Sequence, residues 1–415
     1  MVTASASAAP MRRNVAILAI AQVLFQCTQS MSIATTPLAA YAMLGLDKTA
    51  ATVPIFLSNL GLMLVTLPAA LLMGRVGRKA GFSLGALLGI IGGLTSFAAI
   101  YLQQFGLLCA GALLQGASGA FAWHYRFAAA DMATVEFRPK ALSLVMAGGV
   151  IAGLLGPQTA KWAVDLFNPM MFAGVYAVLA LFSLGMMLMV QLVDIPFVAT
   201  ADAGRGGRPM RQIVQQPTFI AAVLSSMFGY ATMTLVMSAT PLAMQACGFQ
   251  FGDSATVIQW HVVAMFLPSF FTGHLITRFG AQRIIAVGAL LEIGCALVNF
   301  SGIAFSNFVA ANVLVGLGWN FCYVGGSALL TTTYRTEEKA KVQGTHDFLV
   351  YTMTASAAAL SGTLQATAGW SMVNIAALPM LGIVLCAVTW LSIKQRGQPL
   401  TAVQRAGVGV IRVRT

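Results

Sequence analysis

Long apolar runs, separated by short polar breaks, recur along the whole chain. Each run has 18 or more residues, and a helix of that length crosses a hydrocarbon layer of about 30 Å. Because a bilayer offers no water to exposed peptide groups, such runs must be helical, and they are too long for the strands of a membrane barrel. Only 8% of the 415 residues are charged, against roughly 25% in a soluble domain. The sequence therefore predicts an all-α polytopic membrane protein.

The polar breaks divide the chain into twelve predicted transmembrane helices. Their approximate bounds are 14–42, 50–73, 80–101, 107–130, 141–163, 171–193, 217–246, 254–276, 283–303, 306–331, 341–366 and 371–393. The polar segment between the sixth and seventh helices contains several glycines and prolines, which is typical of a linker. We therefore expect an N-terminal six-helix half (1–193), a cytoplasmic linker (194–216), a C-terminal six-helix half (217–393) and a cytoplasmic tail (394–415).

Short sequences of the first half return in the second half, in the same order and at an offset of 203 or 204 residues. The matching pairs are TPLA at 36–39 and 240–243, RVG at 75–77 and RFG at 278–280, and GALL at 85–88 and 288–291. Agreement of this kind indicates internal duplication. We predict two parallel six-helix repeats around a central cavity.

Two loops between predicted helices carry a family signature. The segments LLMGRVGRKAG (71–81) and GHLITRFGAQR (273–283) resemble two copies of the loop signature G-x-x-x-D-R-x-G-R-R of the major facilitator superfamily. The matching positions are Arg75, Gly77, Arg78 and Lys79 in the first copy and Gly273, Arg278, Gly280 and Arg283 in the second. The resemblance implies that fold for the whole chain. Gly74 stands where the family has the acid that locks the inner gate, so the lock here must be weaker or differently built.

The repeated TPLA places one proline in the first predicted helix and one in the seventh, Pro37 and Pro241. A proline removes one backbone hydrogen bond, and inside a membrane the freed carbonyl needs a neighbouring helix or a water-filled cavity. The family resemblance implies that these two helices line the cavity. The alternative is that each proline only shapes a packed helix.

Polar side chains are costly in hydrocarbon, so a stripe of them on one helix face points to the protein interior or to water. The first, fourth, seventh and tenth predicted helices carry such stripes, and the resemblance places these four around the cavity. From these helices and the eighth we predict the substrate-binding residues Gln22, Gln26, Gln29, Gln115, Trp123, Tyr230, Trp260, Asn312, Asn320 and Tyr323. The alternative is that the polar residues form hydrogen bonds between packed helices.

These residues supply amides, hydroxyls and aromatic rings, with few full charges. Such a lining favours a neutral or weakly charged organic solute with a planar body over an inorganic ion or a phosphate. The chain contains no Walker, HExxH or GxSxG motif. We therefore predict no enzyme activity, no catalytic residue, no metal site and no cofactor.

Eight ionisable residues are predicted to gate the cavity or to couple transport to an ion: Arg75, Arg78, Arg126, Asp131, His261, Arg278, His346 and Asp347. The resemblance implies that Asp131 pairs with the signature arginines at the inner gate. Imidazole titrates near neutral pH, so His261 is either a proton carrier or an ordinary core histidine. His346 and Asp347 are candidates for a second gate or for proton binding, and Glu292 is either a coupling residue or a local packing exception.

The basic residues predict the orientation. With the N-terminus inside, 21 of the 23 Lys and Arg fall in cytoplasmic segments or helix ends, and Lys48 and Lys161 lie outside. This distribution places both termini in the cytoplasm. It also accounts for the net charge of +12 without a nucleic-acid partner. We expect a monomer in the lipid bilayer of the bacterial inner (plasma) membrane.

These features together predict a secondary-active transporter of a small organic solute. The stretches WHVVAMFLPSFFTG, GLGWNFCYVGGSALL and VQGTHDF resemble a bacterial branch of the superfamily that includes riboflavin uptake carriers. That resemblance favours uptake of a vitamin-like solute, such as riboflavin, with the proton as the coupling ion. Drug/proton antiporters of the superfamily carry a fifth-helix pattern of which this chain retains only Gly156 and Pro157. Proton-coupled efflux of an organic or toxic compound is the alternative.

Overall fold

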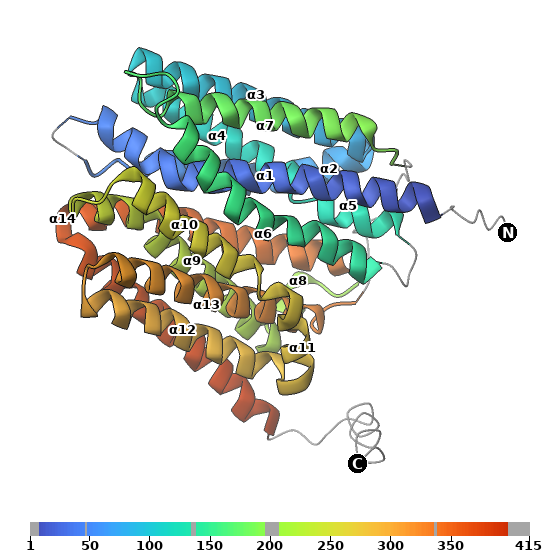
Figure 1. The fold of residues 1–415 in the computed structure, drawn as a ribbon. Helices are drawn as coiled ribbons and strands as arrows, with labels where there is room; N and C mark the ends of the chain where they lie inside the picture. The colour runs from blue at the N-terminus through green and yellow to red at the C-terminus, as the bar shows by residue number, and fades with distance from the viewer. Residues whose placement is uncertain (1–7, 46–47, 134–137, 196–206, 336–337, 397–415) are drawn as a thin grey trace.

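The computed structural model describes residues 8–45, 48–133, 138–195, 207–335 and 338–396, and every regular element in these ranges is an α-helix (Figure 1). The N-terminal half contains α1 (Ala8–Met43), α2 (Val53–Val76), α3 (Arg78–Leu102), α4 (Phe105–Ala122), α5 (Tyr125–Met132), α6 (Arg138–Ala163) and α7 (Ala173–Leu192). The C-terminal half contains α8 (Met210–Val214), α9 (Pro217–Ala246), α10 (Phe251–Phe266), α11 (Ser269–Phe279), α12 (Ala281–Ser301), α13 (Phe305–Thr331) and α14 (Lys339–Arg396).

The helices correspond to the twelve predicted spans, with three differences in how the spans are built. The fourth span is α4 followed by α5, and the eighth is α10 followed by α11 at an angle of 43°. Pro268 stands at this second break. The helix is interrupted there because proline cannot donate the backbone hydrogen bond that a continuous helix requires. The last two spans are the two arms of α14, which meet at Gly369, where φ is 76°. The all-α polytopic fold is confirmed.

The two halves lie side by side, with α1–α7 on one side and α8–α14 on the other (Figure 1). The first residues of α1, the last residues of α14 and the short helix α8 lie at the same end of the molecule. We call this end the linker end, and the other the opposite end. The described part of the predicted linker contains α8.

The repeated RVG and RFG sequences form the same turn twice. Gly77 separates α2 from α3 with φ 90° and ψ 154°, and Gly280 separates α11 from α12 with φ 86° and ψ 145°. A side chain at either position would be strained in this conformation, whereas glycine adopts it readily. The sequence repeat is therefore also a repeat of backbone geometry, in accordance with the predicted duplication.

Candidate functional site

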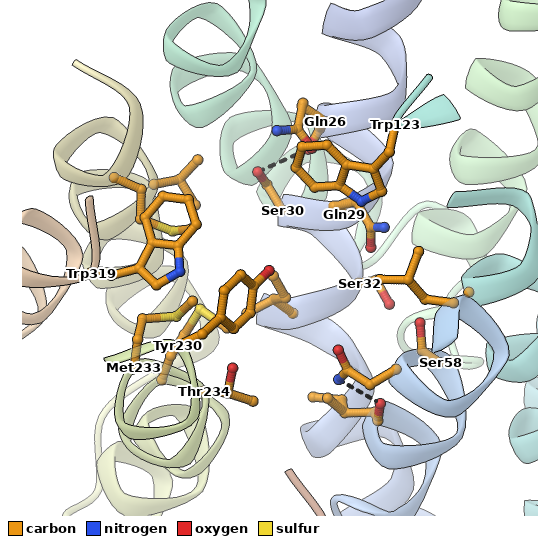
Figure 2. Close-up of a pocket in the computed structure, with 18 of the residues that line it drawn as sticks. Gln26, Gln29, Ser30, Ser32, Ser58, Trp123, Tyr230, Met233, Thr234 and Trp319 are labelled. Carbon is orange, nitrogen blue, oxygen red and sulfur yellow. Dashed lines mark hydrogen bonds between the residues drawn. The ribbon is translucent and has the colours of Figure 1, made fainter. Parts of the chain in front are cut away.

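A cavity lies between the two halves, near the middle of the helices (Figure 2). Its walls come from α1, α2 and α4 on one side and from α9, α10 and α13 on the other. Its empty volume is about 900 Å³ when the space at its openings to solvent is counted. A site shared between two halves changes shape when the halves rock against each other.

The N-terminal wall is mainly polar. Gln26, Gln29, Ser32 and Ser58 face the cavity from α1 and α2, and Trp123 closes this wall from the end of α4 (Figure 2). Among the described residues, neither Gln26 nor Gln29 uses its side-chain amide in a hydrogen bond to another group of the protein. Both amides therefore remain available to a bound solute.

The C-terminal wall is built mainly of aromatic and methionine side chains. Trp319 stacks on Tyr323 with ring centroids 5.4 Å apart and an angle of 10° between the planes. Tyr230 meets both rings edge to face, at 5.4 Å and 5.5 Å. We call Tyr230, Trp319 and Tyr323 the aromatic wall; Tyr230 and Trp319 line the cavity, and the predicted binding residue Tyr323 packs against them outside the lining. Trp123 lies across the cavity from Tyr230 and Trp319 (Figure 2), so a planar solute between the halves has aromatic rings on both sides.

The repeated prolines also relate to this cavity. A proline at position i leaves the carbonyl of residue i−4 without its helical partner. For Pro37 that residue is Ile33, and for Pro241 it is Met237, and both line the cavity. Helices α1 and α9 continue through their prolines without a break. The two prolines therefore stand one turn from corresponding parts of the cavity walls.

Three predicted amides point away from the cavity. Gln115 donates to the Gly89 carbonyl on α3 at 2.8 Å. Asn320 donates to the Met265 carbonyl at 2.7 Å, and Asn312 donates to its own helix at 3.0 Å and to Thr240 at 3.2 Å. These three amides therefore form hydrogen bonds between packed helices, which was the alternative to substrate binding.

Trp260 and Gln22 also lie outside the lining of the cavity. The register of α10 buries Val257, Ile258 and His261, and this leaves Trp260 on the outer face with 46% of its surface exposed. Gln22 is buried one turn from Gln26 in α1, and its side-chain oxygen has no hydrogen-bond partner among the residues that the structure describes. The expectation that Trp260 faces the cavity was wrong.

A group of polar residues joins the halves on the linker side of the aromatic wall. The guanidinium of Arg126 lies 5.6 Å from the ring centre of Trp123 and close to Tyr323 of the other half. The Tyr323 ring is 6.5 Å from the ring of His346, whose Nδ1 is 2.9 Å from Asp347 Oδ1. We call Arg126, Tyr323, His346 and Asp347 the linker-side cluster.

The other predicted gating residues lie apart from this cluster or are fixed by packing. Arg75 and Arg278 are exposed at the linker end, and Arg78 is half-buried. Asp131 belongs to α5, but its side chain lies outside what the structure describes. His261 is fully buried and contacts the Asn312 carbonyl through Nδ1 at 2.8 Å, which ties α10 to α13.

Sequence reasoning missed the contribution of α2. Ser58 and Asn59 line the cavity from this helix, although the second predicted span was not included among the polar stripes. The adjacent serine and asparagine in the otherwise apolar run VPIFLSNLGL were the signal for it. Two neighbouring polar residues do not form a helical stripe, so a search for periodicity passes over them.

At the opposite end the halves touch directly. Gln158 of α6 donates to Gln259 of α10, and Lys161 donates to Thr256, each at 2.6 Å. The backbone N–H of Gly362 in α14 donates to the Thr52 hydroxyl at 3.0 Å. These contacts hold the two halves together between the cavity and the opposite end.

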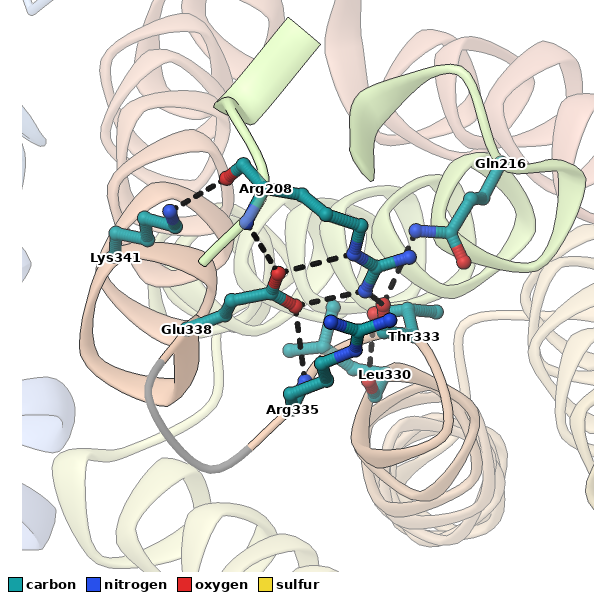
Figure 3. Close-up of polar contacts among 7 residues, drawn as sticks. All are labelled: Arg208, Gln216, Leu330, Thr333, Arg335, Glu338 and Lys341. Atoms are coloured by element: carbon teal, nitrogen blue, oxygen red, sulfur yellow. Dashed lines mark hydrogen bonds and ion pairs between the residues drawn. The ribbon is translucent and has the colours of Figure 1, made fainter. Parts of the chain in front are cut away.

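At the linker end the linker is fixed to the C-terminal half (Figure 3). Arg208 donates to both carboxylate oxygens of Glu338, at 2.9 Å from Nε and 2.7 Å from Nη2. Glu338 also accepts from the backbone N–H groups of Arg208 and Arg335, and Lys341 donates to the Arg208 carbonyl. The Arg208 guanidinium, together with the Arg335 N–H, holds the pKa of the Glu338 carboxyl well below its usual range. We call Arg208, Arg335, Glu338 and Lys341 the linker anchor.

Comparisons with known proteins agree with this architecture. A model of the Major Facilitator Superfamily matches residues 18–258 and 223–412. The riboflavin transporter RfnT of Brucella anthropi is 38% identical over 389 residues, which cover 93% of this chain and 97% of that protein. The uncharacterized MFS-type transporter YddS of Bacillus subtilis is 28% identical over 404 residues and matches over 91% of each chain.

Two solved structures share the fold. The POT family transporter PepTSo has a TM-score of 0.73 at 10% identity, over 92% of this chain and 98% of its own. The nucleoside transporter NupG has a TM-score of 0.65 at 16% identity, over 91% and 99%. At such low identity the likeness concerns the fold alone.

Proposed function

The chain belongs to the major facilitator superfamily, and from this premise we propose that it takes up a flavin-like solute across the bacterial inner membrane together with protons. It is a multi-pass membrane transporter of a small organic solute, and not an enzyme. The substrate, the direction and the coupling ion are our proposal.

The observation that carries this proposal is the lining of the cavity. Trp123 on one side and the aromatic wall on the other suit the two faces of a planar ring system. The amides of Gln26 and Gln29 are free to pair with ring carbonyls, ring nitrogens or hydroxyls. Riboflavin combines these features in an isoalloxazine ring and a polyhydroxyl chain. A relative that is 38% identical over 97% of its length is named a riboflavin transporter, which supports the same substrate class.

Alternating access accounts for the contacts on both sides of the cavity. We place the linker end in the cytoplasm, because Lys48 and Lys161 are the only basic residues of the sequence assigned to the other side. In that orientation, the Gln158–Gln259 and Lys161–Thr256 contacts close the cavity to the outside. Release into the cell then requires the linker-side cluster to part, since its contact between Arg126 and Tyr323 crosses the halves.

Within the linker-side cluster, the His346–Asp347 pair is our candidate for exchanging protons with the cytoplasm. The Asp347 side chain is 36% exposed, whereas that of His346 is 2% exposed. A carboxylate that touches both water and a buried imidazole has a route for the proton in each direction. We propose that the protein works as a monomer.

Growth of a riboflavin-auxotrophic bacterium without its own carrier tests this proposal. Expression of the protein should restore growth at low riboflavin and raise the initial rate of radiolabelled riboflavin uptake, and an uncoupler should abolish accumulation. Trp123→Ala should lose both effects, whereas Trp260→Ala, a tryptophan outside the cavity, should retain them. Lower riboflavin content in expressing cells than in cells with an empty vector would support efflux instead. Unchanged growth and content in correctly inserted protein would refute a flavin substrate.

A further inference from the structure

Glu292 is a carboxyl group buried inside the membrane-spanning part of the C-terminal half. It lies in the middle of α12, and only 1% of its surface is exposed. Within the described part of the chain, neither carboxyl oxygen has a hydrogen-bond partner. Buried polar groups almost always have such partners, so this exception requires an explanation.

The residues around Glu292 lie directly behind the aromatic wall. Its Oε1 is 3.7 Å from the place where a Cβ on Gly229 would stand, and its Cγ is 2.5 Å from the corresponding place on Gly318. Gly229 immediately precedes Tyr230, and Gly318 immediately precedes Trp319. The absence of a side chain at Gly318 leaves room for the side chain of Glu292, and one carboxyl oxygen lies at ordinary contact distance from the Gly229 position. Glu292 therefore packs against the backbone positions that directly precede two rings of the wall.

None of the residues that the structure describes places a positive charge beside Glu292. The titratable groups that face Glu292 are the thiols of Cys295 on α12 and Cys322 on α13. Among the described residues, α9 and α14 bring no Lys, Arg or His against it. An ionised carboxylate without a cation or hydrogen bond is far more costly to bury than the neutral acid. The surroundings of Glu292 in this structure therefore favour its protonated, neutral form.

The repeat position of Glu292 in the N-terminal half holds no acid. At the offset of 203 residues its counterpart is Gly89 on α3. A Cβ there would stand 2.8 Å from the hydroxyl oxygens of Ser118 and Ser183. The N-terminal half thus closes the equivalent position by packing, and the C-terminal half keeps a titratable group there.

We infer that Glu292 is a proton-binding site behind the aromatic wall, and that its protonation holds the wall in the arrangement seen here. The inference rests on the proposed proton-coupled transport and names a site for the proton. When Glu292 loses its proton, the carboxylate must gain water or a partner, which requires α9 and α13 to move apart. Such a movement changes the positions of Tyr230 and Trp319, and with them the affinity for the solute.

Two non-titrating variants test this role, Glu292→Gln and Glu292→Met, with Asp165→Asn as the matched control for an exposed carboxylate. In proteoliposomes, a gradient of one pH unit is a tenfold ratio of proton concentrations. For each proton transported it can drive at most about a tenfold ratio of riboflavin concentrations across the membrane, because equal concentration ratios store equal free energy. Both variants should retain riboflavin exchange without a gradient, but should lose at least part of this accumulation. The control should accumulate riboflavin as the wild type does. Wild-type accumulation in either variant would overturn the inference.

A measurement without solute separates this inference from the choice of substrate. Thermal unfolding in detergent should show wild-type protein losing stability relative to both variants as the pH rises from about 5 to about 8, since burial disfavours the ionised acid. The difference in unfolding temperature between the wild type and Asp165→Asn should stay constant over this pH range. If riboflavin is not transported but this pH dependence is present, the substrate is wrong and the proton site stands. If the unfolding temperatures of the wild type and both variants change in parallel with pH, Glu292 is not a proton-binding site.

Discussion

Replacing Gly116 with alanine should separate two helices that form the polar side of the cavity. A Cβ at this position would stand 1.8 Å from the backbone oxygen and 2.6 Å from the carbonyl carbon of Ser58 on α2. One turn away on α2, a Cβ on Gly61 would stand 2.3 Å from the backbone oxygen of Leu113 on α4. The two helices thus touch backbone to backbone at two successive levels, and rotation of a side chain cannot relieve the contact.

The loss of stability expected for Gly116→Ala follows from these distances. Ordinary contact between heavy atoms begins at about 3.5 Å, so α2 and α4 must move apart by well over 1 Å. Overpacking of a tight core usually costs about 1–3 kcal/mol, and a clash with rigid backbone belongs at the upper end of that range. Because Ser58 and Gly116 both line the cavity, solute binding should weaken together with stability.

The assay is thermal unfolding of purified Gly116→Ala in detergent, with riboflavin binding measured on the same sample. The control is Gly382→Ala, since a Cβ at Gly382 in α14 meets no atom within 4 Å. That control should be neutral or stabilising by up to about 1 kcal/mol, because alanine favours the helix over glycine. Gly116→Ala with wild-type stability and binding would refute the close approach of α2 and α4.

Three further changes test the site and the linker anchor. Trp123→Ala should weaken riboflavin binding by roughly 5- to 150-fold in a fluorescence titration, since stacking of a heterocycle on an aromatic ring is worth about 1–3 kcal/mol. Gln26→Leu should weaken binding by roughly 2- to 10-fold, the range for one hydrogen bond, and wild-type binding would contradict the assigned cavity face. Glu338→Gln should lower the unfolding temperature at neutral pH. Because the pKa of Glu338 is lowered in the folded protein, its contribution is present above the ordinary carboxyl pKa and is lost as the pH falls, so the difference from the wild type should shrink below about pH 4.

Several features of the fold could be predicted from local sequence patterns. Hydropathy alone indicates the spans, because a membrane helix must be both long and apolar. The duplicated RVG and RFG could be read as a repeat, and they form matching glycine turns at Gly77 and Gly280. The breaks within the fourth and eighth spans were not predicted, because a helix broken inside one apolar run leaves the hydropathy unchanged.

The cavity lining was predicted only in part, and the reason is geometric. A polar stripe indicates that a helix face is covered, but it does not tell whether a neighbouring helix or a cavity covers it. Gln26 and Gln115 looked equivalent in the sequence, yet one faces the cavity and the other is hydrogen-bonded to α3. The contact between Arg126 and Tyr323 depends on how the two halves pack, which no local pattern records.

Transport in proteoliposomes tests the central claim most directly. Purified protein is reconstituted, and riboflavin uptake is measured with a more acidic medium outside, with equal pH, and with the gradient reversed. We expect riboflavin to accumulate inside the proteoliposomes above the external concentration, carried by the protein molecules whose outer face meets the acidic medium. At equal pH we expect no accumulation. Trp123→Ala should lose the accumulation, and Trp260→Ala should retain it. Uptake that never exceeds equilibration under any gradient, or equal loss in the two tryptophan variants, would contradict proton-coupled flavin transport through this cavity.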